Sequence, residues 1–288
     1  MKTAKYHLIA LVVIIIWGTT FVATKMLLNT GLSAGEIFFY RFLLAYFGIW
    51  FFGPRKLFSD NLKDEFLLFL SGIFGGSLYY LAGNTALQIT QASNVALLAC
   101  TSPLLTILFS RLFLKKKEEN PHLLKGSILA IIGVILVIFN GHFILQINPL
   151  GDMLSLLASL SWAVYSVMLK YLGGSYSMLF ITRKIFFYGL LSLLPLIIYD
   201  GGFFNLRLLN GGTVIGSLLY LGIAASLLCY FLWNTVIKRL GAVRANNYVY
   251  FSPVVTMTAS AVLLGESITL TAMAGAIFIL AGLILAER

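Results

Sequence analysis

The sequence predicts an all-α integral membrane protein with ten transmembrane helices, arranged as two inverted five-helix repeats with both termini in the cytoplasm. Three observations lead to this fold class: an apolar composition, apolar stretches of membrane-spanning length, and an internal repeat. The chain has 288 residues, of which 60% are apolar and 10% are charged, and its mean hydropathy is +0.95. A water-soluble core of this size could not hide so much apolar surface, so lipid is the expected solvent.

The apolar stretches recur along the whole chain with only short polar breaks, which leaves no room for a separate soluble domain. Crossing a hydrocarbon layer of roughly 30 Å takes about 20 apolar residues in a helix. Continuous apolar runs such as 11–16 favour helices over barrel strands, in which apolar and polar residues would alternate. The predicted helices span 5–27, 34–52, 66–90, 92–114, 123–140, 151–171, 178–199, 211–237, 244–263 and 270–286.

Basic residues gather in alternate breaks between these helices, with Lys25 and Arg207 as the main exceptions. The positive-inside rule therefore places these breaks and both termini in the cytoplasm. In a soluble protein the net charge of +10 would suggest a nucleic-acid partner, but here it comes from loops on one side of a lipid bilayer. We therefore expect no nucleic-acid partner. The basic residues of these breaks are Lys2, Lys5, Arg55, Lys56, Lys63, Lys115, Lys116, Lys117, Lys125, Lys170, Arg183, Lys184, Lys238, Arg239 and Arg244.

An internal repeat appears when the sequence is aligned with itself at an offset of 150 residues, which matches 72–103 with 222–253 without a gap. Matched Tyr, Asn and Ser-Pro positions make the alignment specific, because matches of Leu and Ile are common in such a composition. The predicted repeats are residues 1–145 and 146–288. Equivalent residues are Gly72 and Gly222, Tyr80 and Tyr230, Asn84 and Asn234, Pro103 and Pro253 and, with small shifts, Trp17 and Trp162, Arg41 and Arg183, Gly126 and Gly275, and Gly133 and Gly282.

Each repeat contains an odd number of helices, so the second repeat enters the membrane from the opposite side. The two halves are then related by a pseudo-twofold axis in the membrane plane. Inverted repeats favour inward-open and outward-open states around a midplane site, which is the basis of alternating access. The repeat requires the first helix, although its basic start and the apolar segment 8–17 also fit a signal peptide.

Several motifs occur in a fixed order and are partly duplicated. They are Trp17-Gly18-Thr19-Thr20-Phe21, Arg41, Ser102-Pro103, Ser252-Pro253, Leu264-Gly265-Glu266, Gly275 and Gly282. Over essentially its full length, the sequence resembles the EamA-type, ten-helix members of the drug/metabolite transporter superfamily. The resemblance implies secondary transport, frequently export of amino acids, metabolites or toxic compounds, through a cavity lined mainly by helices three, four, eight and nine and their neighbours. The first half has lysines at 115–117 opposite Glu266, so this glutamate is given no duplicated role.

Two equivalent polar pairs lie on the third and eighth predicted helices. Tyr80 and Asn84 are four residues apart and share one helix face, as Tyr230 and Asn234 do. Amide and phenol groups are costly in lipid, so both faces are predicted to point into the bundle. There they either line a cavity or hydrogen-bond neighbouring helices, and the residues alone favour neither.

Arg41 lies about seven residues into its helix, roughly 10 Å from the start. A cation at this depth pairs with a substrate carboxylate, pairs with Glu36 or Asp152, or extends to the membrane interface. Trp17 and Trp162 lie well inside their helices, where they form an aromatic wall around a substrate or pack in the core. The predicted substrate-binding residues are Trp17, Arg41, Tyr79, Tyr80, Asn84, Trp162, Tyr230, Asn234, Asn247 and Tyr248.

Helix-breaking residues also recur at matching points. Pro103 and Pro253 are predicted to kink their helices, either as hinges for alternating access or as static bends. Gly72 and Gly76 form a GxxxG spacing, which predicts close helix packing within one subunit or between two. A homodimer therefore remains an alternative to a monomer.

No catalytic residue, metal site or cofactor is predicted. The sequence has no Walker A or GxGxxG pattern, its 3 histidines form no ligand cluster, and no acid–base pair has catalytic spacing. The rival hypotheses are an intramembrane enzyme acting on a lipid-linked substrate and a scaffold or regulatory subunit without transport. We expect a non-enzymatic, multi-pass secondary transporter of the cell membrane. It would export small amphipathic metabolites, such as amino acids, by alternating access.

Overall fold

The computed structural model describes residues 4–52, 56–89, 95, 98–114, 122–139, 148–199, 209, 211–264 and 269–287. Every regular element within these ranges is a helix. The sequence features at Lys2, Arg55, Ala92, 115–117, Arg207 and 265–266 lie outside the described residues.

Most helices follow the predicted ranges closely, but a turn at 100–101 interrupts the predicted helix 92–114. The first half contains α1 (Ala4–Asn29), α2 (Ala34–Ile49), α3 (Leu62–Gly72), the π-helical segment η1 (Ile73–Ser77), α4 (Leu78–Ile89), α6 (Ser102–Leu114) and α7 (His122–Phe139). The second half contains α8 (Pro149–Leu172), α9 (Met178–Tyr199), α10 (Gly212–Leu219), the π-helical segment η3 (Tyr220–Leu228), α11 (Cys229–Leu240), α12 (Ala242–Asn247), the 3-10 turn η4 (Tyr248–Phe251), α13 (Ser252–Leu264) and α14 (Leu270–Glu287).

Among the described residues, 5 helical stretches are long and apolar enough to cross a membrane. They are Ala4–Asn29, Leu62–Ile89, Pro149–Leu172, Met178–Leu196 and Gly212–Leu240. Shorter apolar helices accompany them at Ser102–Phe113, His122–Val137 and Leu270–Ala286. The prediction of an all-helical chain with several apolar spans is thus confirmed for this part of the chain.

Local sequence signals set several helix ends. α2 begins at a capping box, in which Ser33 accepts a hydrogen bond from the Glu36 N–H and the Glu36 carboxylate accepts one from the Ser33 N–H. Asn61 and Asn148 cap α3 and α8 by accepting hydrogen bonds from backbone N–H groups of the first turn. Gly241, with a φ of 97°, makes the turn between α11 and α12, a conformation that L side chains rarely adopt.

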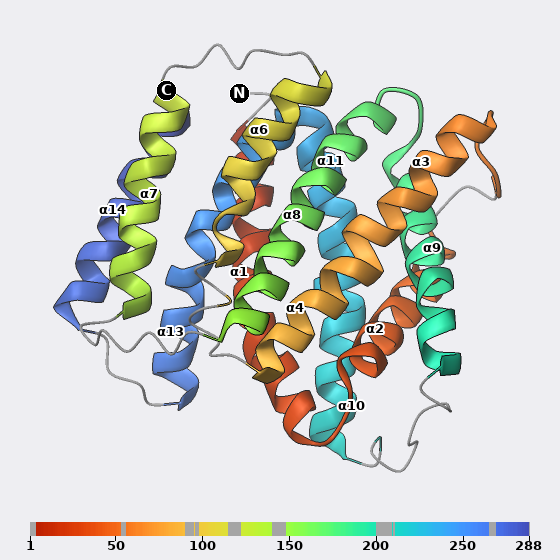
Figure 1. The fold of residues 1–288 in the computed structure, drawn as a ribbon, viewed down its shortest axis with the longest axis horizontal. Coiled ribbons are helices and arrows are strands. Elements are labelled where there is room, and N and C mark those ends of the chain that lie inside the picture. The colour runs from red at the N-terminus through yellow and green to blue at the C-terminus, as the bar shows by residue number, and fades with distance from the viewer. Residues whose placement is uncertain are drawn as a thin grey trace.

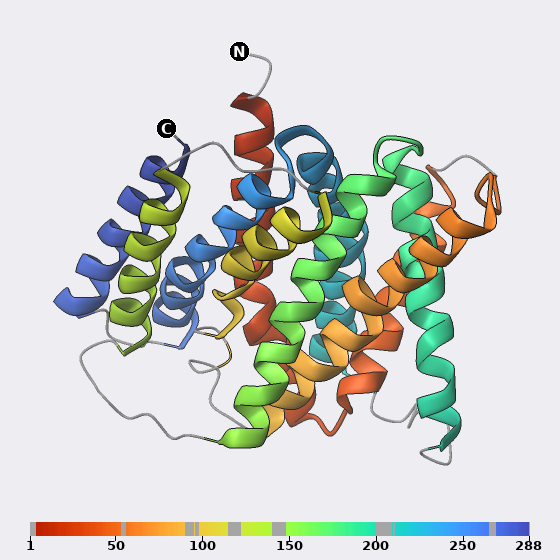
Figure 2. The same cartoon turned by 45° about the horizontal axis from the view of Figure 1, so that its top comes forward.

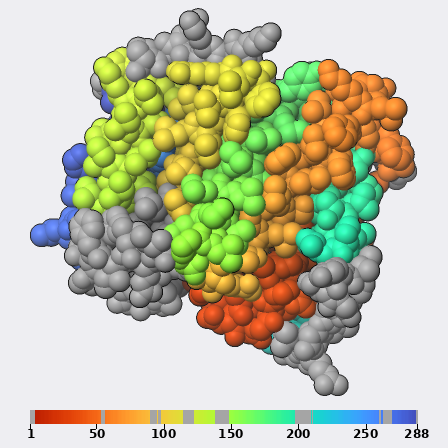
Figure 3. Space-filling model, viewed as in Figure 1, coloured from red at the N-terminus to blue at the C-terminus, as the bar shows by residue number. Residues whose placement is uncertain are grey.

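Helices from the two halves are interleaved. α8 packs against both α6 and α4, and it lies between them on the face shown in Figure 3. α1 packs against α11 and α13, α2 against η3, and α3 against α9. Figure 1 and Figure 2 show that α1 begins and α14 ends at the same end of the molecule. Each half therefore buries much of its surface against the other half.

Large apolar side chains lie on the outside of the bundle, and polar side chains are turned inward. Leu8, Phe66 and Ile277 are among the exposed apolar residues. The buried polar residues include Arg41, Asn84, Asn234, Asn246 and Asn247. Apolar side chains thus cover the outside of the bundle as well as filling its core, which suits a lipid surround.

α7 and α14 lie side by side at one edge of the molecule (Figure 1). A Cβ atom on Gly126 would lie 2.5 Å from the carbonyl oxygen of Gly282, and one on Gly133 would lie 2.5 Å from that of Gly275. The earlier glycine of each helix thus meets the later glycine of the other, so the helices run antiparallel. Crossed contacts between equivalent residues are characteristic of a twofold axis and support the inverted repeat.

The π-helical segments η1 and η3 occupy equivalent places in the two halves, because η1 shifted by 150 residues falls at 223–227, inside η3. Such segments alter the regular helical hydrogen-bond ladder and expose carbonyl groups to other donors. The Tyr230 hydroxyl donates to the Gly75 carbonyl at 2.6 Å, and Trp17 Nε1 donates to the Ala225 carbonyl at 2.9 Å. Each segment is therefore bonded by a side chain from the other half.

The GxxxG spacing is used inside the chain. A Cβ atom on Gly72 would lie 2.5 Å from Tyr188 Cβ of α9, and one on Gly76 would lie 3.1 Å from the Phe42 ring of α2. Close packing at these glycines is confirmed, with partners from the same chain.

Pro103 and Pro253 each follow a break in regular α-helical geometry, which is a turn at 100–101 before Pro103 and the 3-10 turn η4 before Pro253. α6 and α13 begin at Ser102 and Ser252, so Pro103 and Pro253 are each the second residue of a helix. The 3-10 turn η4 directly precedes α13. Proline is tolerated at a helix start because the N–H that it lacks would have no helical partner there.

Candidate functional site

A cavity of about 110 Å³ lies between α1, α2, α4, α6, α8 and the start of α13. It brings together six of the predicted substrate-binding residues: Trp17, Arg41, Tyr79, Tyr80, Asn84 and Trp162. Hydroxyl groups of Thr20, Thr24, Ser102, Ser155 and Ser159 and apolar side chains such as Phe21 and Leu87 complete much of the lining. Both halves of the chain contribute, as a site at a repeat interface requires.

Aromatic rings form one wall of the cavity. The ring centroids of Trp17 and Trp162 are 5.3 Å apart in an edge-to-face arrangement, and Tyr79 lies 5.0 Å from Trp162. The indole N–H of Trp17 is bonded to the Ala225 carbonyl, and that of Trp162 donates to Asn246 Oδ1 at 2.9 Å. These bonds fix both rings. Each tryptophan therefore packs in the core and lines the cavity at the same time.

Arg41 lies inside the bundle and does not extend to its outer surface. Its side chain is 2% exposed, its Nε atom donates to Ser226 Oγ at 2.9 Å, and its guanidinium carbon lies 4.2 Å from the centre of the Tyr80 ring. The stacking on Tyr80 is a cation–π contact. Within the part of the chain that the structure describes, no ion pair joins Arg41 to Glu36 or Asp152.

The equivalent polar pairs have different surroundings. Tyr80 and Asn84 line the cavity, and Asn84 Nδ2 lies at the long distance of 3.4 Å from the Ala34 carbonyl. Tyr230 and Asn234 do not line it, and both are completely buried.

Asn234 makes the contacts expected of a residue that joins helices. It accepts a hydrogen bond from the Tyr165 hydroxyl of α8 at 2.5 Å and donates one to Thr182 of α9 at 2.7 Å. Its amide therefore connects three helices in this conformation.

The other two predicted substrate-binding residues, Asn247 and Tyr248, do not line this cavity either. The hydroxyl of Tyr248 lies 2.6 Å from His7 Nδ1. The side-chain amide of Asn247 is buried, and neither of its polar atoms has a hydrogen-bond partner among the described residues. Pro253 lines the cavity, whereas Pro103 does not.

Three of the four helices that the family resemblance names, helices three, four and nine, contribute to the lining of the cavity. Helices one and six, represented by α1 and α8, supply much of its wall, and helix eight supplies none of its lining residues among those described. Trp17 and Trp162, which line the cavity, each lie 6.0 Å from the ring of Tyr230, which does not.

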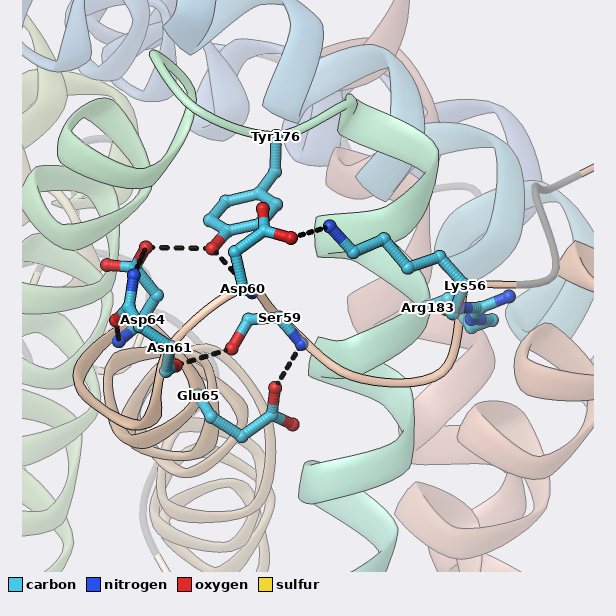
Figure 4. Close-up of polar contacts among 8 residues, drawn as sticks. All are labelled: Lys56, Ser59, Asp60, Asn61, Asp64, Glu65, Tyr176 and Arg183. Atoms are coloured by element: carbon cyan, nitrogen blue, oxygen red, sulfur yellow. Dashed lines mark hydrogen bonds and ion pairs between the residues drawn. The ribbon is translucent and has the colours of Figure 1, made fainter.

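A second polar cluster lies at one end of the bundle, outside the cavity (Figure 4). The Tyr176 hydroxyl donates to Asp64 Oδ2 at 2.8 Å and accepts a hydrogen bond from the Asp60 N–H at 3.1 Å. Burial raises the pKa of the Tyr176 phenol above its usual value, and the Asp64 carboxylate raises this pKa further. The cluster thus joins the α2–α3 and α8–α9 connections.

Glu65 extends this cluster to α9. Its carboxylate forms an ion pair with Lys184 and accepts hydrogen bonds from the Tyr188 hydroxyl and the Ser59 N–H. Arg183 donates to the carbonyl of Lys56. Sequence reasoning missed these contacts, because the only local signal is the Asn61 cap, and the α9 residues are more than a hundred positions away.

The model of the EamA-like transporter family matches residues 4–139 and 149–287, once in each half. An uncharacterized transporter of Archaeoglobus fulgidus is 30% identical over 286 residues, which cover 98% of this chain and 97% of that protein. A protein of Salmonella typhimurium named probable amino-acid metabolite efflux pump is 29% identical, covering 96% of this chain and 92% of its own length. The Escherichia coli protein of the same name is 27% identical, with coverages of 97% and 93%. A solved crystal structure shares the fold, with a TM-score of 0.78 at 18% identity over 98% of this chain and 95% of that one.

Proposed function

Because the chain belongs to the EamA-like transporter family, we propose that it is a secondary transporter that exports small amphipathic metabolites, such as amino acids, across the cytoplasmic membrane by alternating access. The family and the names of the relatives are those of transporters rather than enzymes. The observation that carries the proposal is the cavity between the two halves, whose lining combines an arginine, an amide and hydroxyl residues with an aromatic wall. Such a lining suits a solute with one polar and one apolar part.

The proposed topology has ten membrane passes, with repeats at 1–145 and 146–288 and both termini in the cytoplasm. Its support is a group of lysines at one end of the bundle. Lys184 donates to Leu57 O at 3.0 Å, Lys170 to Lys238 O at 3.1 Å, and Lys238 to Tyr176 O at 3.4 Å. These bonds tie basic segments from distant parts of the sequence together, as expected for one cytoplasmic face.

The two polar pairs suggest how the conformations alternate. In an inverted repeat, each half adopts in one state the conformation that its partner has in the other state. Tyr80 and Asn84 line the cavity here, so Tyr230 and Asn234 would line its counterpart in the opposite state. Asn247 and Tyr248 would contact the solute on the same path, and the breaks before Pro103 and Pro253 would act as the hinges.

Flux through liposomes tests this function. Purified protein would be reconstituted and screened with labelled amino acids, sugars and nucleosides, with and without a proton gradient. Saturable flux of one solute class that is lost in Asn84→Ala, and kept in the exposed-site control Thr258→Ala, is the expected result. Absence of flux for every class would favour the scaffold alternative.

A further inference from the structure

We infer that Arg41 is an anion-binding group and that the cavity prefers a small amphipathic carboxylate without a neighbouring ammonium group to the amino acids named in the proposed function. This inference names the substrate class of the cavity and rests on the proposed transport function. It predicts that monoanionic organic acids bind better than the zwitterionic amino acids that share their side chains.

Arg41 brings a positive charge into the bundle. Guanidinium groups stay protonated at any physiological pH, so this buried side chain carries a full positive charge. A buried charge is costly unless an opposite charge accompanies it. None of the cavity-lining residues that the structure describes is acidic. Glu36 is engaged in the cap of α2.

The two Nη atoms of Arg41 are the donors of this side chain that remain available to a ligand. The Nε atom of Arg41 is used by Ser226, and the Tyr80 ring covers one face of the guanidinium. The two Nη atoms make no hydrogen bond to the described residues, and Arg41 lines the cavity. A planar pair of Nη donors matches the two oxygens of a carboxylate, whereas a phosphate dianion would need further cations.

The cavity favours an apolar group on the ligand and disfavours a second positive charge. The wall formed by Trp17, Tyr79 and Trp162 accepts an apolar or aromatic group. An α-ammonium group would enter a cavity that already contains one uncompensated cation and would find only neutral acceptors among the described lining residues. A monocarboxylate neutralises Arg41, but a zwitterion brings a second positive charge with it.

Three probes with the same ring and different charges test the inference. They are 3-phenylpropanoate, phenylalanine and phenylalaninamide, and the readout is stabilisation of the detergent-purified protein against thermal unfolding. We expect 3-phenylpropanoate to bind about tenfold more tightly than phenylalanine, because one unpaired charge is avoided, and phenylalaninamide to give no shift. A shift with the amide as large as with the acid, or no shift with the acid, would overturn the inference.

Variants of Arg41 localise the site. Loss of a charge-assisted hydrogen bond should weaken 3-phenylpropanoate by about 10- to 100-fold in Arg41→Gln, and by less in Arg41→Lys, which keeps the charge but loses the planar pair of donors. The control Arg244→Gln removes an exposed arginine and should leave binding unchanged. Folding of Arg41→Lys is checked by size-exclusion chromatography, and unchanged binding in this folded variant and in Arg41→Gln would contradict the assignment.

Liposome flux separates this inference from the proposed function. Binding that depends on Arg41, without flux of any solute, would leave the anion site standing and remove the transport function. Flux of phenylalaninamide that equals that of the acid in both the parent and Arg41→Gln would keep transport and remove the anion site.

Discussion

The indole rings of Trp17 and Trp162 touch edge to face with centroids 5.3 Å apart, so residues that match in the two halves of the sequence meet in the structure. Both indoles also donate one hydrogen bond to the second half of the chain. The central contact between the repeats and one wall of the cavity are therefore formed by the same two side chains.

Removing the indole N–H of Trp17 should destabilise the fold. In Trp17→Phe, the buried Ala225 carbonyl loses its side-chain donor, and the expected loss is about 1–3 kcal/mol in the free energy of unfolding. Thermal unfolding of the detergent-purified variant measures this effect. The lipid-facing control Phe66→Leu should change stability little, and equal losses in both variants would contradict the special role of Trp17.

Adding a methyl group at the α7–α14 contact should be harmful. In Gly126→Ala, the new Cβ would lie 2.5 Å from the Gly282 carbonyl oxygen, so the helices must separate, and we expect a loss of about 1–3 kcal/mol. Gly216 of α10 is the matched control, because a Cβ there meets nothing within 4 Å. Gly216→Ala should be neutral or stabilising by up to about 1 kcal/mol, since alanine favours helix. A stable Gly126→Ala protein would show that the two helices are not in close contact.

The Glu65–Lys184 ion pair should matter more than its exposed neighbour. The side chain of Lys184 is 5% exposed, so Glu65→Gln leaves a buried cation unpaired, with an expected loss on the order of 3 kcal/mol. The Lys56–Asp60 pair, at 2.5 Å, has side chains that are 44% and 68% exposed. Asp60→Asn should therefore cost less than about 1 kcal/mol. Equal thermal shifts for the two variants would show that burial does not distinguish the pairs.

Equivalent asparagines should respond differently to substitution. Asn234→Ala removes the partner of both Tyr165 and Thr182, and we expect a loss of about 2–3 kcal/mol in stability. Asn84→Ala removes one weak bond and should change flux more than stability. The test combines thermal unfolding with liposome flux, and the reverse ranking would contradict the assignment of Asn84 to the cavity and Asn234 to helix contacts.

Much of the fold could be predicted because the membrane imposes simple length and polarity requirements on the sequence. The helix predicted at 178–199 coincides with α9, and the one predicted at 66–90 corresponds to the continuous stretch α3–η1–α4. The GxxxG spacing of Gly72 and Gly76 predicted close helix packing, since only small residues allow backbones to approach each other.

The candidate site could be predicted only in part, because equivalent sequences have different surroundings in one conformation. Tyr80 and Tyr230 match in the alignment, yet only Tyr80 lines the cavity. The ion pair of Glu65 with Lys184 was missed, since it depends on how α3 and α9 pack and leaves no local pattern. The π-helical segments were missed as well, because their only sequence signal is a group of small residues that also fits a regular helix.

The π-helical segments have a consequence for how the chain holds together. Trp17 of the first half supplies the donor for Ala225 of the second, and Tyr230 of the second half supplies the donor for Gly75 of the first. Each half thus contains a carbonyl that accepts a hydrogen bond from a side chain of the other half, so the two halves resemble the subunits of a heterodimer that are covalently linked. If either half were removed, the other half would lose the side chain that donates to its π-helical segment.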